Sequence, residues 1–129
     1  MDRTSATQPA NAAAPALDPE AALMIRPLKT HADFSACVAL QRATWGEAYN
    51  DCVPASILKI TQRVGGVAAG AFSAEGELLG FVYGLTGVEH GHLIHWSHML
   101  AVHPEYRNHG IGRRLKEYQR DVLVRLGVE

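Results

Sequence analysis

The stretch MLAVHPEYRNHGIGRRLKEYQRDVLVRLG, residues 99–127, decides the fold of this chain. It begins with an apolar extended run, continues through a loop with two glycines, and ends in the pattern of an amphipathic helix. That helix is predicted from Ile111 to about Leu126, because its apolar residues recur at intervals of three and four. These residues are Ile111, Leu115, Tyr118, Val122 and Leu126. Gly127 follows them, at a position where glycine commonly ends a helix.

The loop between the strand and the helix has the features of an anion-binding site. Backbone N–H groups in the first turn of a helix have no partner within the helix, and the helix dipole adds partial positive charge there. Gly110 and Gly112 let the backbone approach a phosphate closely. Arg107, Arg113 and Arg114 add positive charge around the same end. The loop is therefore expected to bind a phosphate-bearing ligand.

Two nucleotide-binding loops are excluded by spacing. The Rossmann fingerprint needs a third glycine, and Leu115 stands where it is required. A Walker A loop needs the ending G-K-[ST], which the chain lacks. The residues alone leave a nucleotide site of another kind, a sugar-phosphate site, or a tight turn without a ligand.

Upstream of this stretch, the pattern predicts a short strand and two helices. The strand covers residues 23–30, where Pro27 favours an edge position or a bulge. The first helix runs from His31 to about Thr44 and ends at Gly46, and the second lies between residues 54 and 66. The first helix has a loose apolar face formed by Phe34, Val38, Gln41, Ala43 and Trp45.

Three extended runs separate these helices from the final one. They cover residues 67–73, 78–86 and 93–102, and residues 74–77 (AEGE) form a hairpin turn between the first two. The element order is therefore β-α-α-β-β-β-α. This order indicates an α/β fold in which helices flank a sheet.

Composition limits the class of protein further. The 129 residues amount to one domain, and a hydrophobic share of 47% with a net charge of −1 is typical of a soluble globular protein rather than a nucleic-acid binder. No apolar run approaches the roughly 20 residues of a membrane span. Residues 1–21 are rich in Ala and Pro and are predicted to be a disordered tail, which leaves residues 22–129 as the domain. Cys37 and Cys52 are too few for a disulfide framework, so we expect a cytoplasmic protein with reduced thiols.

The motif around the loop resembles the signature of the GNAT family (GCN5-related N-acetyltransferases). The chain contains V-x-P-x-x-R-x-x-G-x-G-x-x-L, and the family signature is [RQ]-x-x-G-x-[GA] between its fourth strand and third helix. The motif residues are Val102, Pro104, Arg107, Gly110, Gly112 and Leu115. The element order is similar as well, and the resemblance covers about residues 23–129. It implies a mixed, mostly antiparallel sheet flanked by helices.

The resemblance implies an acyl-CoA-dependent N-acyltransferase, with acetyl-CoA or another acyl-CoA as co-substrate and no metal. The loop amides would bind the pyrophosphate of coenzyme A, and the end of the preceding strand would pair with its pantetheine arm. An amide there can polarise the thioester carbonyl, and the amine attacks directly. The implied cofactor-binding residues are Leu100, Ala101, Val102, Arg107, Asn108, His109, Gly110, Ile111, Gly112 and Arg113.

Five of the seven histidines lie between residues 90 and 103, but a metal cluster does not follow. Alternate residues of a strand face opposite sides, so His92 and His98 are expected on one face and His95 on the other. A zinc site needs three or four converging ligands.

His98 is instead the first candidate for the catalytic base. The arylalkylamine branch of the family has His-x-His before Leu-Ala-Val-His, and His98 matches one of those histidines while Trp96 replaces the other. Imidazole titrates near neutrality, which suits a base that takes a proton from an ammonium group. Alternatively, His98 has only a structural role in the strand. Glu89 is a second candidate for the catalytic base. Tyr106 and Trp45 either line the site or only pack.

The resemblance also implies elements that are expected after residue 129, namely a fifth strand, a fourth helix and a final hairpin. The fourth helix often carries a tyrosine that acts as the general acid, so that residue is not expected in this chain. The acceptor is expected to be a small-molecule amine or an amino acid, without nucleic acid or membrane partners, and a homodimer is possible. The alternatives are a non-catalytic module that binds coenzyme A or another phosphate ligand, and a truncated fragment without activity, in which case this chain alone is expected to be inactive.

Overall fold

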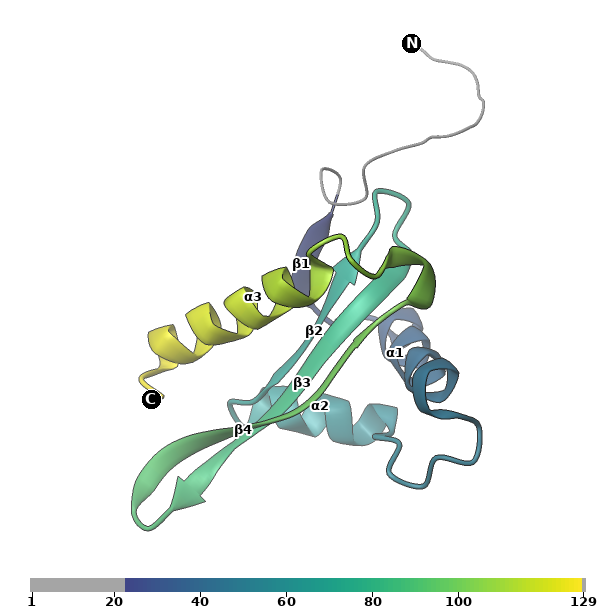
Figure 1. Cartoon of the computed structure of the whole chain (residues 1–129). Coiled ribbons are helices and arrows are strands. Elements are labelled where there is room, and N and C mark those ends of the chain that lie inside the picture. The colour runs from purple at the N-terminus through teal and green to yellow at the C-terminus, as the bar shows by residue number, and fades with distance from the viewer. Residues whose placement is uncertain (1–22, 129) are drawn as a thin grey trace, which may run out of the picture.

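The computed structural model describes residues 23–128, so the tail predicted at residues 1–21 lies outside the described residues. The elements follow one another as β1 (Met24–Pro27), α1 (His31–Trp45), α2 (Ala55–Arg63), β2 (Val67–Phe72), β3 (Leu78–Glu89), β4 (His92–Val102), the 3₁₀ helix η1 (Pro104–Tyr106) and α3 (Ile111–Leu126). The four described strands form one sheet in the order β1-β2-β3-β4, and each neighbouring pair is antiparallel (Figure 1). The predicted order of elements is therefore confirmed.

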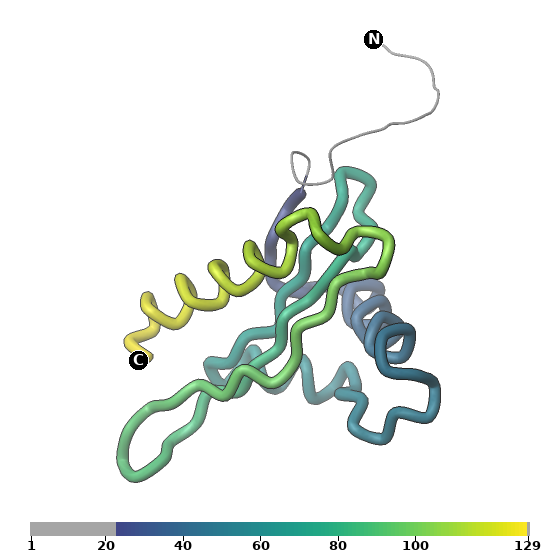
Figure 2. Tube along the Cα trace, in the orientation of Figure 1, coloured from purple at the N-terminus to yellow at the C-terminus, as the bar shows by residue number. Residues whose placement is uncertain are grey.

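The helices cover opposite faces of this sheet, with α1 and α2 on one face and α3 on the other (Figures 1 and 2). Strand residues alternate between the two faces, which divides the core into two clusters. On the face of α1 and α2, Tyr83 and Met99 pack with Phe34 and Leu58. On the face of α3 lie Val67, Ala69, Ala71, Leu79, Val82, Ile111 and Leu115.

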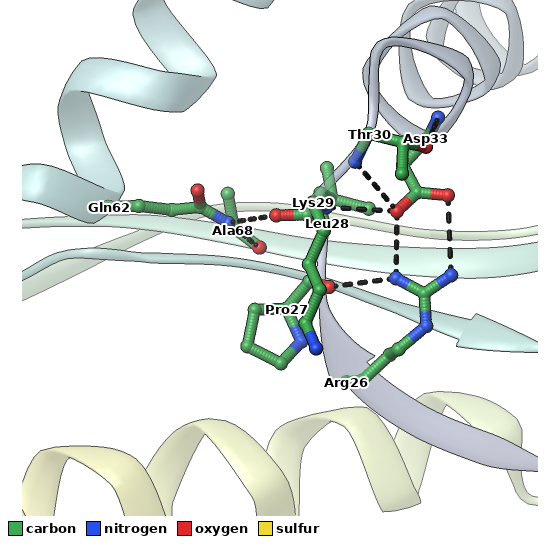
Figure 3. Close-up of polar contacts among 8 residues, drawn as sticks. All are labelled: Arg26, Pro27, Leu28, Lys29, Thr30, Asp33, Gln62 and Ala68. Carbon is green, nitrogen blue, oxygen red and sulfur yellow. Dashed lines mark hydrogen bonds and ion pairs between the residues drawn. The ribbon is translucent and has the colours of Figure 1, made fainter.

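Polar contacts around Asp33 join β1 to the start of α1 (Figure 3). The backbone N–H of Asp33 donates to Thr30 Oγ1, and the Asp33 carboxylate accepts from the backbone N–H of Thr30, which completes a capping box. Arg26 Nη1 donates to Asp33 Oδ2 at 2.7 Å. The Arg26 guanidinium also lies 3.8 Å from the ring centroid of Phe72. The beginning of α1 is thereby fixed to β1 and β2.

A buried glutamine fixes the end of α1 relative to the start of α2. Gln41 is fully buried, and its side-chain amide exchanges two hydrogen bonds with the backbone of Val53, at 2.9 and 2.6 Å. In the same way, Gln62 of α2 donates to the carbonyls of Leu28 and Ala68 (Figure 3). Val53 and Leu28 lie in loops, where a side-chain amide satisfies backbone groups, whereas the Ala68 carbonyl lies in β2 and also accepts from the backbone N–H of Leu28.

The buried faces of the helices differ in part from the predicted ones. On α1, Cys37 and Leu40 are buried, whereas Ala43 and Trp45 of the predicted face are exposed. The buried positions are spaced at three and four residues, and the predicted face shifted off that spacing after residue 41. On α3, Leu126 is 53% exposed, while the polar residue Gln119 is 3% exposed.

The strands β3 and β4 form a longer hairpin than the sequence predicted. β3 continues to Glu89 rather than to residue 86, and β4 begins at His92 rather than at residue 93. The pairing register shifts once: Tyr83 pairs with Met99, but Gly84 pairs with Ser97. His98 is therefore an extra residue in β4, as in a β-bulge. A bulge leaves no mark in an alternating pattern, so the sequence did not predict it.

Candidate functional site

The predicted loop lies between the end of β4 and the start of α3. The backbone N–H of His103 donates to the carbonyl of Leu79 at 2.7 Å, which holds the end of β4 against β3. The His103 ring caps the 3₁₀ helix, since its Nδ1 accepts from the backbone N–H of Glu105. Arg107 Nε donates to the carbonyl of Val102 at 3.2 Å. The loop is therefore folded back onto the strand that precedes it.

Gly110 places the first turn of α3 at the end of this loop. Its φ of 78° is in the left-handed region, which favours glycine. The helical hydrogen bonds of α3 begin with the N–H of Arg114 donating to the carbonyl of Gly110. The amides of Ile111 and Gly112 precede that bond, in the turn where N–H groups have no partner within a helix. The buried side chain of Ile111 anchors this turn to the sheet.

The first turn of α3 lies against the end of β4, and we call the surface that these two segments form the cradle. A Cβ added to Gly112 would come within 3.8 Å of the side chains of both Leu100 and Val102. Leu100 is 40% exposed, whereas the neighbouring Ala101 is buried in the core on the opposite face. Among residues 23–128, no strand pairs with the outer edge of β4. The cradle and this edge are the surfaces that a phosphate and an extended ligand arm would contact.

The positive charge of the loop comes from side chains at its surface. Arg107 is exposed, and Arg113 forms an exposed ion pair with Glu117 at 3.2 Å. Asn108 has a left-handed φ of 70°, and His109 is exposed beside it. The predicted cofactor-binding residues therefore gather at one place, from Leu100 to Arg113.

His98 lies two residues before Leu100, at the bulge. It is exposed, and its ring makes an edge contact with Tyr83, with ring centroids 6.1 Å apart. The Tyr83 hydroxyl is hydrogen-bonded to Thr61 of α2 at 2.9 Å, which fixes the aromatic surface under the imidazole. Trp96 pairs with Leu85 on the same face of the sheet and is 65% exposed. The chemistry available here is proton transfer by an accessible imidazole next to the cradle.

The second candidate base lies far from this place. Glu89 pairs with His92 at the tip of the β3–β4 hairpin, six residues along β4 from His98. At the rise of a strand, that separation is about 20 Å. The structure therefore brings His98, but not Glu89, close to the predicted cofactor-binding residues.

Trp45 and Tyr106 both pack in the fold. Trp45 lies against Tyr49 and makes an edge contact with Phe81. Tyr106 packs against His103 and against the cluster on the α3 face, and its partial burial raises the pKa of its hydroxyl.

A polar cluster on the α3 face was missed by sequence reasoning. His95 contacts Thr86 and Gln119, and Lys116 donates to Ser97 at 2.7 Å. The cluster borders a pocket of about 580 Å³ between β4 and α3. Its residues come from three elements. The one sequence feature that indicates the cluster is Gln119, a polar residue within the apolar spacing of α3.

Within the described part of the chain, no three His, Cys, Asp or Glu side chains are grouped so that they could hold a metal ion. No helix among the same residues has the length and apolar character needed to span a membrane.

Comparison with known proteins identifies similar sequences and structures. The family model described as an acetyltransferase (GNAT) domain matches residues 67–127. An acetyltransferase of Trypanosoma brucei is similar in structure, with a TM-score of 0.65 and 20% identity over 82% of this chain and 78% of that one. No curated protein sequence matches this chain.

Two aminoglycoside acetyltransferases are also similar in structure. An aminoglycoside 6′-N-acetyltransferase complexed with coenzyme A has a TM-score of 0.61 and 25% identity, over 79% of this chain but 56% of that one. An aminoglycoside acetyltransferase from an uncultured soil metagenomic sample has a TM-score of 0.71 and 16% identity, over 85% and 75% of the two chains.

Proposed function

We propose that the chain is an acyl-CoA-dependent N-acyltransferase that acts on the amine of a small molecule or an amino acid. The match of residues 67–127 to the acetyltransferase (GNAT) domain supports this proposal. The observation that supports this most is the cradle between the end of β4 and the first turn of α3. It combines a left-handed Gly110, amides of the first helical turn, and a strand edge next to an exposed histidine. Acetyl-CoA is the expected co-substrate, in keeping with a cytoplasmic enzyme.

The first step of the proposed mechanism is binding of the pyrophosphate. The amides of Ile111 and Gly112 point out of the first turn of α3, where the helix dipole favours an anion. Arg107 lies on the loop beside them, with its Nε held by the carbonyl of Val102. The pantetheine arm would then extend along the outer edge of β4, past Leu100, and bring the thioester close to the bulge.

The second step is transfer of the acyl group. His98 would take a proton from the ammonium form of the acceptor, which leaves a neutral amine. The amine nitrogen attacks the carbonyl carbon of the thioester, the C–S bond breaks, and sulfur leaves with the bonding electron pair. The attacking nitrogen gives up a second proton as the amide forms, and that proton converts the thiolate to the thiol of coenzyme A. A backbone amide at the end of β4 would stabilise the negative charge that develops on the carbonyl oxygen.

The apolar surface around His98 supports a small molecule as the acceptor. Two structures that resemble this chain are those of aminoglycoside acetyltransferases. The face that bears His98 also carries exposed Trp96 and Leu85, which form an apolar surface next to the base. An apolar surface of this kind suits a compact organic amine better than a strongly basic protein tail. The predicted homodimer stays a prediction.

The test is an assay of thiol release from acetyl-CoA with a panel of primary amines: a polyamine, an aminoglycoside, an arylalkylamine and free amino acids. His98→Gln is expected to lower the rate by about 10²- to 10⁴-fold, the usual contribution of a general base. His92→Gln is the matched control, because His92 is an exposed histidine on the same strand and face. Binding of acetyl-CoA without thiol release for any amine would contradict the enzyme and favour the non-catalytic binding module.

A further inference from the structure

The position of His98 depends on how β4 is held on both sides of the bulge. After the bulge, Met99 and Ala101 are buried in the core against α1 and α2. Before the bulge, Ser97 is exposed and His95 is only partly buried, so core packing does not fix this segment. Pairing with β3 holds the backbone of this segment, with Ser97 opposite Gly84 and His95 opposite Thr86. Contacts of its side chains with α3 add a restraint on the other side of the sheet.

Gln119 of α3 provides that restraint through His95. The side chain of Gln119 is buried, and its Nε2 lies 2.8 Å from His95 Nε2. The other ring nitrogen, His95 Nδ1, lies 2.9 Å from Thr86 Oγ1. The imidazole is thus held between β3 and α3, three residues before His98.

Lys116 fixes the direction of the Gln119 amide. Its Nζ donates to Gln119 Oε1 at 2.9 Å and to Ser97 Oγ at 2.7 Å. An ammonium group only donates, so it must face the amide oxygen, and the amide NH₂ must face His95. His95 Nε2 therefore accepts, and the ring proton lies on Nδ1 and is donated to Thr86. Burial, and next the charge of Lys116, lower the pKa of His95, which agrees with this neutral tautomer.

Gly84 makes room for this arrangement directly opposite the bulge. A Cβ on Gly84 would overlap Nε2 and Cε1 of His95 and would come within 2.8 Å of Gln119 Nε2. Gly84 is also the residue at which the register with β4 shifts. The imidazole, the amide and the glycine backbone are therefore packed together at the start of the bulge.

We propose that Gln119 is a positioning residue that acts through His95 and Ser97 to hold β4 before the bulge and so sets the orientation of His98. Gln119 lies on the same helix whose first turn forms the cradle, so one rigid element relates the base to the bound thioester. We call the group formed by Thr86, His95, Ser97, Lys116 and Gln119 the clamp. Its role in catalysis rests on the proposed function. The restraint on His98 is a property of the free chain and is measurable without turnover.

The experiment is NMR spectroscopy of the histidine side chains in the full chain. The Cε1–H signal of His98 is assigned by its loss in His98→Gln. Gln119→Met keeps the volume of the side chain and removes its hydrogen bonds, and it is expected to abolish the cross-peak between His98 and Tyr83 and to shift the Cε1–H signal of His98. Arg120→Met is the matched control, because Arg120 follows Gln119 in α3 but forms its ion pair with Asp121 and not with β4. It should change neither signal.

Lys116→Met provides a second variant in case Gln119→Met does not fold, because Lys116 is exposed and its replacement creates no cavity. It releases the amide of Gln119 and is expected to shift the His98 signal in the same direction. A His98 cross-peak and Cε1–H signal that stay as in the parent chain, in both variants, would overturn the clamp. Acetyl-CoA titrated into the same samples separates the two ideas: a parent chain that fails to bind it contradicts the proposed function, whatever the His98 signal shows.

Discussion

At the scale of single residues, the surroundings distinguish His98 from Glu89 as a candidate base, and Cys37 from Cys52 as a reactive thiol. His98 is next to the predicted cofactor-binding residues, and Glu89 is six residues further along the strand. Alternation in a strand correctly placed His92 and His98 on one face. It could not show that His98 is an extra residue in a bulge, because that depends on the register with β3.

Cys37 is expected to be inert in the folded chain. Burial raises the pKa of its thiol to about 12, although a hydrogen bond from Gln41 lowers it. Only the thiolate reacts readily, so at pH 8 the reactive fraction is about one in ten thousand. Alkylation at pH 8 should modify Cys52, which is partly exposed, and should reach Cys37 only at the rate of unfolding.

Mass spectrometry of the modified peptides checks this expectation, and Cys52→Ser is its control. In that variant, no rapid modification should remain in the native chain. A rapid reaction that persists in Cys52→Ser would mean that Cys37 is accessible and would contradict the packing of α1 against the sheet.

At the scale of elements, the beginning of α1 depends on Asp33. Its carboxylate accepts from Arg26 and from the backbone N–H groups of Lys29 and Thr30. These hydrogen bonds hold the pKa of Asp33 well below its usual range, and the hydrogen bond from Arg26 has the largest effect. Burial acts in the opposite direction and raises the pKa, but its effect is smaller. Asp33→Asn is expected to lower the free energy of unfolding by about 1–3 kcal/mol at pH 7, as for the loss of a cap and a charged partner.

The pH dependence of this contribution follows from the direction of the pKa. Because the folded-state pKa of Asp33 is depressed, its stabilisation is complete above the unfolded-state pKa of about 4 and is lost as the pH falls below it. Denaturant unfolding of the parent chain and Asp33→Asn should therefore differ by a constant amount from pH 7 to about 5 and converge in stronger acid. Asp121→Asn, at an exposed ion pair, is the control. If the difference in unfolding free energy between the two chains grew on acidification, the pKa of Asp33 would not be depressed in the folded chain.

Some elements were more predictable than others, for physical reasons. The bounds of α3 agree with the sequence because its apolar spacing is regular and both ends carry glycine in the left-handed region, Gly110 and Gly127. The face of α1 was predicted only in part, because the predicted face leaves, at Ala43 and Trp45, the spacing of three and four residues that the buried positions of this helix keep. The clamp around Gln119 was missed, since its members are close only after α3 packs on the sheet.

At the scale of the whole molecule, the order of elements and the central motif were enough to predict the architecture. The loop is useful only because the sheet holds the end of β4 beside the first turn of α3. The helix then crosses the same face and contacts β4 again at Ser97 through Lys116. One helix therefore links the predicted phosphate site to the strand that carries His98.

Binding of acyl-CoA at the first turn of α3 is measurable by calorimetric titration of the chain with acetyl-CoA. Gly110 and Gly127 flank the same helix with φ values of 78° and 80°, so Gly110→Trp and Gly127→Trp introduce the same change under the same backbone strain. We expect saturable binding to the parent chain and to Gly127→Trp, and none to Gly110→Trp. Binding that survives in Gly110→Trp, or a folded parent chain that binds no acetyl-CoA, would contradict it.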